Sequence, residues 1–220
     1  MSSSLVDRYD SVRRILRTKR SEPTTVCGVV KKQDPKVIEQ FLGFGMRDLG
    51  VNYTQEGEKL RTQFTDPSIR WHFIGHIQSR KVKALADYDV VQSLDRLDIA
   101  AALNQQVEPR KKILSVLVQV NIGEEPQKSG VSVHELKEFL KKLNTLPFLK
   151  PAGLMALPPG LEDVERRRPY FKRMKSLYDE YKETFPFETL SMGTSEDFVI
   201  AAEEGANFVR LGTVLFGSRV

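Results

Sequence analysis

The sequence predicts an α/β fold that consists of a single (β/α)8 barrel of the TIM type. Eight short apolar segments alternate with helical patterns along the chain. No two neighbouring strand segments are joined by a hairpin turn, and this favours parallel strands connected by helices. The length of 220 residues lies near the lower end for such barrels. Because no linker-like stretch divides the chain, we expect residues 1–220 to form one domain.

Each predicted element follows from hydrophobic spacing or from a residue that begins or ends it. Apolar residues from Leu5 to Leu16 recur at helical spacing and predict an opening helix over residues 5–17. Pro35 is typical of a helix start and predicts the helix over residues 36–44. The predicted strands cover residues 24–31, 48–53, 71–75, 89–93, 114–121, 151–157, 189–192 and 208–211. The remaining predicted helices cover residues 55–63, 79–86, 96–104, 133–143, 161–184 and 196–204.

Hydropathy and cysteine content restrict the class of protein. The mean hydropathy is −0.36, and the longest apolar stretches, such as 114–120, are too short to span a bilayer. The first residues contain no apolar core of the kind that a secretory signal needs. The one cysteine, Cys27, excludes a disulfide framework and is interpreted as a small core residue. These observations predict a soluble cytoplasmic protein without a membrane partner.

The net charge of +5 does not by itself indicate nucleic-acid binding. The 34 basic residues are scattered along the chain, some of them in pairs or in the run 166–168, and no zinc-finger, KH or RNP signature is present. A small anionic ligand would explain a local positive field equally well. A basic nucleic-acid-binding module therefore remains the less favoured alternative, and we expect no nucleic-acid partner.

Lys31 and Lys32 end the first predicted strand, at the edge where the chemistry of such barrels gathers. A partly desolvated lysine loses basicity and can form a Schiff base with an aldehyde. The alternative is a pair of solvated lysines that open a loop.

Two turns rich in small residues follow the last two predicted strands. The first spans residues 191–195 and precedes the helix predicted over 196–204, and the second comprises Gly212 and Thr213. Backbone N–H groups and hydroxyls in such turns bind phosphate, whereas the alternative is that Thr194 or Ser195 only caps a helix. Arg210 precedes the second turn, where it could form an ion pair, bind phosphate or donate to an aromatic nitrogen.

Several other patterns do not carry chemistry. The segment 123–129 resembles a phosphate-binding loop but lacks its second glycine. His72, His76 and His134 are too scattered to predict a metal site, and His72 is interpreted as a packed strand residue. No nucleophile, base and acid arrangement stands out, so no catalytic residue is predicted.

Nine short segments match one known family in order. They are VVK at 29–31, GMRDLGVNYTQE at 45–56, WHFIGHIQS at 71–79, SLDR at 93–96, VNI at 120–122, KSG at 128–130, GLM at 153–155, SMG at 191–193 and VRLGT at 209–213. On these segments the chain resembles the pyridoxal 5′-phosphate (PLP) homeostasis proteins, relatives of the N-terminal barrel of alanine racemase. The resemblance implies a PLP barrel of fold type III without the C-terminal β-domain.

The resemblance also implies a role for individual residues in binding PLP. The Schiff-base lysine falls on Lys31, the arginine facing the pyridine nitrogen on Arg210, and an asparagine of the second strand on Asn52. The phosphate-binding residues fall on Ser191, Gly193, Thr194, Ser195, Gly212 and Thr213. The chain departs from the family pattern at three positions, where it has Val30 for serine, Val51 for glutamate and Thr194 for methionine.

The implied function is the buffering or delivery of PLP within the cell, with PLP and apo-enzymes that require it as partners. An arginine cannot protonate the ring nitrogen, so the ring would be a poor electron sink. The opposing base that racemases take from a C-terminal domain is not expected after Val220. We therefore expect a monomeric carrier or regulator without substantial turnover. The alternatives are a small PLP-dependent amino-acid racemase or a Schiff-base aldolase on the same barrel.

Overall fold

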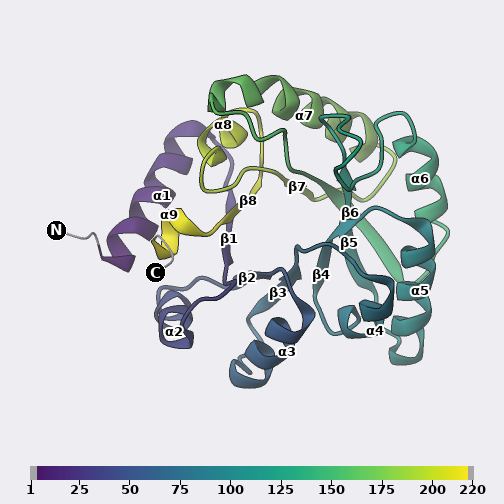
Figure 1. Cartoon of the computed structure of the whole chain (residues 1–220), viewed down its shortest axis with the longest axis horizontal. Coiled ribbons are helices and arrows are strands. Elements are labelled where there is room, and N and C mark those ends of the chain that lie inside the picture. The colour runs from purple at the N-terminus through teal and green to yellow at the C-terminus, as the bar shows by residue number, and fades with distance from the viewer. Residues whose placement is uncertain (1–3, 218–220) are drawn as a thin grey trace.

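The computed structural model describes residues 4–217 and contains a closed barrel of parallel strands in the order β1 to β8 (Figure 1). This arrangement confirms the predicted (β/α)8 fold, while residues 1–3 and 218–220 of the predicted single domain lie outside the described residues. The strands are β1 (Thr25–Val29), β2 (Asp48–Val51), β3 (Arg70–Phe73), β4 (Val90–Leu94), β5 (Leu114–Val120), β6 (Leu149–Ala156), β7 (Thr189–Ser191) and β8 (Phe208–Leu211). The barrel closes where β1 pairs with β8, with Cys27 opposite Arg210.

Helices cover the outside of the barrel (Figure 1). They are α1 (Leu5–Lys19), α2 (Pro35–Gly43), α3 (Thr54–Gln63), α4 (Val82–Leu85), α5 (Leu97–Val107), α6 (Leu136–Leu143), α7 (Arg168–Lys182), α8 (Phe198–Glu203) and α9 (Thr213–Phe216). Short 3-10 turns are η1 (Ser79–Lys81), η2 (Glu108–Arg110) and η3 (Val164–Arg167). No helix among residues 4–217 is long and apolar enough to cross a membrane.

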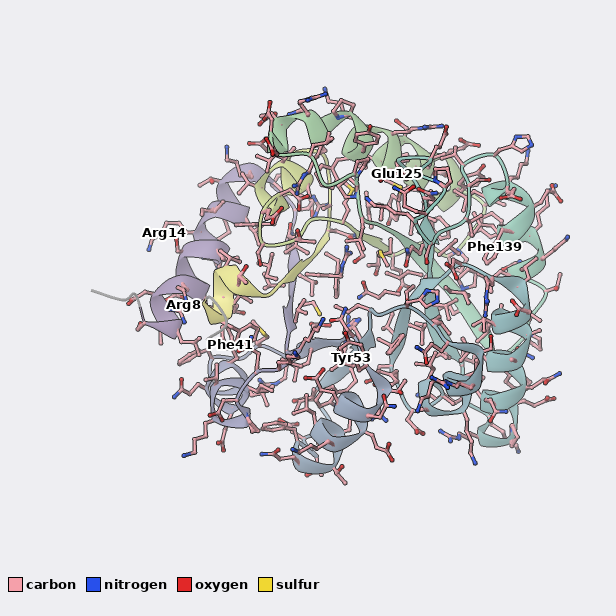
Figure 2. All side chains as sticks on the ribbon, in the orientation of Figure 1. Arg8, Arg14, Phe41, Tyr53, Glu125 and Phe139 are labelled. Carbon is pink, nitrogen blue, oxygen red and sulfur yellow. The ribbon has the colours of Figure 1, made fainter. Side chains whose placement is uncertain are left out.

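The hydrophobic core lies between the strands and the helices. In α6 the buried residues Leu136, Phe139, Leu140 and Leu143 recur at helical spacing and form one apolar face. Phe41 of α2 is fully buried in the same layer, and Figure 2 labels both phenylalanines.

The opening helix α1 completes the outer ring next to the last strand. The helix that follows β8, α9, has four residues and is too short to cover the strand alone. α1 packs against both α8 and α9, and Arg8 Nε donates to the Leu215 carbonyl at 2.6 Å. The first helix therefore covers the side of the barrel that the short final helix is too small to cover.

Several predicted helices differ from the observed ones, and the helix predicted over 133–143 begins only at Leu136. Residues 161–184 contain η3 before α7, because Asp163 caps the 3-10 turn and Pro169 sits at the start of the regular helix. Residues 79–86 form η1 followed by the short α4, and the helix predicted over 196–204 spans Phe198–Glu203. Strand β6 begins before Pro151, where the pairing with β5 shifts register and accommodates the missing N–H.

Candidate functional site

Lys31 lies at the carboxyl end of β1, two residues beyond its last paired position. Side chains alternate along a strand, and Val30 is fully buried in the layer outside the barrel. Lys31 is therefore directed towards the mouth of the barrel, by which we mean its open end at the carboxyl ends of the strands. Its Nζ atom lies 4.9 Å from the ring centroid of Tyr53, which is 52% exposed and is labelled in Figure 2. Lys32 is exposed, adopts φ of 56° and donates its backbone N–H to Glu56 at 2.5 Å. The geometry therefore favours Lys31 over Lys32 as the lysine whose amine lies at the mouth of the barrel.

Arg210 on β8 is buried inside the barrel without a carboxylate partner. Its Nη1 donates to Ser191 Oγ at 2.6 Å and its Nη2 to the Ala156 carbonyl at 3.0 Å. Within residues 4–217 it forms no ion pair, so the ion-pair alternative for this residue is not observed. Burial is the main cause that lowers the pKa of Arg210, to about 10. The guanidinium is still charged at neutral pH, and its charge is available to a ligand.

A chain of hydrogen bonds runs from Arg210 through the interior of the barrel. Ser191 Oγ donates to Gln92 Oε1 at 2.7 Å, and Gln92 Nε2 lies 2.9 Å from His72 Nδ1. His72 Nε2 lies 2.8 Å from Asp48 Oδ1, which also pairs with Arg70 Nε at 3.0 Å. Asp48 and Arg70 begin their strands, so the chain links the two ends of the barrel.

The Arg210 guanidinium at one end of this chain determines the direction of every hydrogen bond in it. A guanidinium can only donate, so the Ser191 hydroxyl accepts from Arg210 and gives its own proton to Gln92. The Gln92 amide then accepts through Oε1 and donates through Nε2 to His72 Nδ1. This assigns the His72 tautomer that carries its proton on Nε2 and donates it to Asp48. His72 is 1% exposed, which confirms the interpretation of a packed histidine.

The two turns after β7 and β8 lie together. Ser195 Oγ accepts the backbone N–H groups of Gly212 at 3.0 Å and Val214 at 3.3 Å. Gly193 adopts φ of 93°, and a Cβ there would lie 2.6 Å from that of Ala201, so this turn requires glycine. Ser195 therefore joins the two turns, the second of which includes Thr213.

The alternative role of the hydroxyls in the first turn, as a cap of the next helix, is wrong. The helix after the first turn begins at Phe198 with Asp197 as N-cap, so neither Thr194 nor Ser195 caps it. The Thr194 N–H and hydroxyl both donate to Asp197 Oδ1, at 2.7 and 3.0 Å. Asp197 in turn binds Arg167 at 2.9 Å. The carboxylate thus takes up the Thr194 donors that were predicted for an anion.

The structure brings some predicted site residues together and separates others. Ser195, Gly212 and Thr213 share one side of the mouth, whereas Lys31 and Asn52 follow the neighbouring strands β1 and β2. Ser191 is fully buried beneath them, with its hydroxyl engaged in the interior chain. Asn52 Oδ1 is buried and has no hydrogen-bond partner.

Sequence reasoning missed the interior chain itself. His72 and Gln92 are polar residues inside short apolar strands and Asp48 begins another, and that pattern is the signal that could have identified them. Cys27 is fully buried as predicted, and burial raises the pKa of its thiol. No group of three or more histidine, cysteine or acidic residues able to hold a metal ion occurs within residues 4–217.

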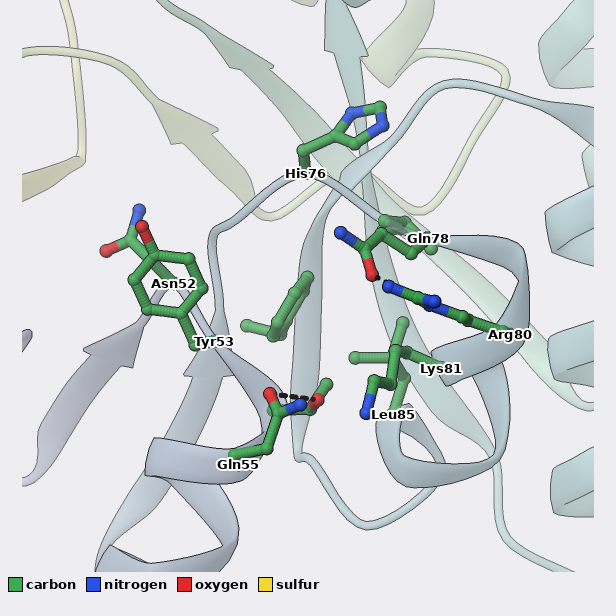
Figure 3. Close-up of a pocket in the computed structure, with 11 residues that line it drawn as sticks. Asn52, Tyr53, Gln55, His76, Gln78, Arg80, Lys81 and Leu85 are labelled. Atoms are coloured by element: carbon green, nitrogen blue, oxygen red, sulfur yellow. Dashed lines mark hydrogen bonds between the residues drawn. The ribbon is translucent and has the colours of Figure 1, made fainter.

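A cavity of about 510 Å³ adjoins the mouth between the segments that follow β2 and β3 (Figure 3). Its lining comes from both segments and from the floor beneath them: Asn52, Tyr53, Thr54, Gln55, Phe73, His76, Ile77, Gln78, Arg80, Lys81 and Leu85.

Comparison with known proteins defines the class first. The family model described as "Alanine racemase, N-terminal domain" matches residues 4–220. The chain is 18% identical to the alanine racemase of Corynebacterium glutamicum, with a TM-score of 0.71 over 97% of this chain and 61% of that one. That similarity concerns the barrel fold.

Closer relatives narrow the family. The pyridoxal phosphate homeostasis protein of Aquifex aeolicus is 40% identical over 88% of this chain and 86% of its own length, and that of Escherichia coli K12 is 36% identical over 90% and 87%. The structure of PipY from Synechococcus elongatus with PLP bound has a TM-score of 0.87 at 26% identity, and it covers 97% of this chain and 100% of that one. The chain belongs to the family of pyridoxal phosphate homeostasis proteins.

Proposed function

We propose that this protein binds PLP through Lys31 and buffers or delivers it, without substantial turnover of amino acids. The observation that carries the proposal is the buried Arg210, whose charge has no carboxylate partner, beneath a mouth that also presents a lysine amine. PLP-bound PipY and the names of the relatives support PLP as the ligand. When bound, PLP supplies an electrophilic aldehyde and an electron-withdrawing aromatic ring.

The residues present fit such a ligand at three points. Arg210 is a buried donor that would satisfy the acceptor nitrogen of a pyridine ring. Two hydroxyls of the turns are donors for a phosphate: that of Thr213, and that of Ser195, whose oxygen accepts the Gly212 and Val214 N–H groups while its proton remains. Asn52 Oδ1 lacks a hydrogen-bond donor, which a ring hydroxyl would provide.

The role of Lys31 is to hold the ligand covalently through its amine. Its position at the mouth, between β8 with its turn and β2 with Asn52, lets one molecule contact all three groups. Borohydride reduction of the PLP-loaded protein, followed by peptide mapping, tests this assignment. We expect the label on Lys31 and its loss in Lys31→Ala, with Lys32→Ala as the matched control. A label on Lys32 would overturn the assignment.

The character of Arg210 supports the proposed carrier role. With a pKa of about 10 the guanidinium donates a hydrogen bond but keeps its proton near neutral pH, so it does not protonate a ring nitrogen. An unprotonated pyridine ring would be a weaker electron sink, and this disfavours removal of a proton from the α-carbon of an amino acid. A chiral assay with L-Ala, L-Ser and L-Glu measures the difference. Steady racemisation above about 1 s⁻¹ would support the racemase alternative instead.

A further inference from the structure

The cavity between the segments after β2 and β3 shares only Asn52 with the proposed PLP site, and its other lining residues have no role there. Tyr53 and Gln55 lie on one side of it, and Arg80 and Lys81 lie on the other (Figure 3). The buried ring of Phe73 contributes an apolar floor. Its volume of about 510 Å³ is sufficient for a small organic molecule.

The charge around the cavity is positive and not offset. Arg80 and Lys81 line it, and no lining residue is acidic. In the part of the chain that the structure describes, neither Arg80 nor Lys81 forms an ion pair. The Arg80 side chain has one long contact, from Nε to Gln78 Oε1 at 3.4 Å. These cations are therefore available to an external anion.

The polar groups of the cavity are mainly donors. Gln55 Oε1 accepts from the Thr54 hydroxyl at 3.2 Å, which leaves the Gln55 amide N–H groups for a ligand. Gln78 uses its oxygen for Arg80 in the same way. A ligand that matches this lining must supply acceptor oxygens.

The position of the cavity is set by a close approach of two backbones. A Cβ at Gly75 would lie 2.0 Å from the Asn52 carbonyl oxygen, so only glycine lets the segment after β3 approach Asn52. Tyr53, which lines the cavity, is also the ring 4.9 Å from Lys31 Nζ. In the strand order the turns after β7 and β8 lie on one side of β1, and the cavity lies on the other.

We propose that this cavity is a second binding site, separate from the two turns, for a small organic anion with an apolar body. A carboxylate or a phosphate ester would supply the acceptor oxygens for Arg80 and Lys81, while its carbon skeleton packs on Phe73. The WHFIGHIQS segment noted in the sequence contributes to this site through Phe73, His76 and Gln78.

The test uses two probes with the same aromatic body, benzoate and phenyl phosphate, and neutral benzyl alcohol as reference. Amide NMR shifts of residues 76–81 are followed during titration, together with those of 193–195 and 212–214. We expect at least one anion to shift residues 76–81 at concentrations where benzyl alcohol does not. The double variant Arg80→Gln/Lys81→Gln should weaken that binding about five- to tenfold, since it removes two partly exposed charge contacts.

The matched control is Lys83→Gln, which removes an exposed lysine of α4 that does not line the cavity. It should leave the affinity nearly unchanged. Equal weakening in both variants would indicate nonspecific electrostatic attraction of the anion and would overturn the proposed site. Shifts confined to residues 193–195 and 212–214 would also overturn it, while supporting a phosphate at the turns. Shifts at 76–81 for one anion alone identify that anion class as the ligand.

Discussion

Replacement of Gln92 by leucine tests the interior chain directly. The substitution keeps a side chain of similar size in β4 but removes both of its hydrogen bonds. The Ser191 hydroxyl then loses its acceptor and His72 Nδ1 loses its donor, in a region where both residues are at most 2% exposed. Each orphaned group costs about 1–3 kcal/mol, so the free energy of unfolding should fall by about 2–6 kcal/mol.

Urea unfolding followed by the fluorescence of Trp71, the single tryptophan, measures this loss. The matched control is Gln119→Leu in β5, which removes one hydrogen bond near the surface, to the Ser129 carbonyl. A loss below about 0.5 kcal/mol for Gln92→Leu would refute the reasoning, because a buried chain cannot be broken at that cost.

A double-mutant cycle separates the chain from simple packing. In a Ser191→Ala background there is no hydroxyl left to orphan, so Gln92→Leu should cost less than in the unmodified protein by about 1–2 kcal/mol. Additive losses would show that the two side chains act independently. Nitrogen-15 NMR of His72 supplies a second readout, since Nδ1 should be unprotonated and should change its shift when the Gln92 donor is removed.

Three further predictions concern other parts of the molecule. Ser195→Ala removes the acceptor that joins the two turns and should weaken PLP binding by about 1–2 kcal/mol, measured by fluorescence titration; unchanged affinity would place the phosphate elsewhere. Burial raises the pKa of Asp95, so the folded state holds its proton more tightly than the unfolded chain. Stability should therefore fall as pH rises from 3.8 through that raised pKa, and Asp95→Asn should reduce this slope in unfolding curves recorded from pH 3.8 upwards. Cys27 is fully buried and burial raises its thiol pKa, so a thiol reagent should react with the folded protein no faster than the protein unfolds.

The order of strands and helices could be read from the sequence because it depends on local periodicity. Segments such as 114–120 alternate with amphipathic helices such as α6, and parallel strands joined by helices leave few other topologies. The helix boundaries were less accurate where 3-10 turns replace regular helix, as before α7. Such endings depend on single side-chain caps rather than on periodicity.

The sequence by itself determined which residues lie at the carboxyl edge of the barrel. Lys31, Asn52, Arg210 and the turn at Gly212 each follow or end a predicted strand, and parallel strands place these ends at one edge. The proposal of Lys31 rather than Lys32 draws on the backbone, because Lys32 adopts a left-handed conformation and is exposed.

The tertiary structure alone decided which polar side chains form hydrogen bonds with one another. Ser191 and Gln92 are 99 residues apart in the chain and His72 and Asp48 are 24 apart, yet closure of the barrel joins them into one chain of hydrogen bonds. Likewise, the contact of Thr194 with Asp197 depends on where α8 begins. Local periodicity specifies the face on which a side chain lies, whereas its partner depends on the register between strands, which is set only when the sheet closes.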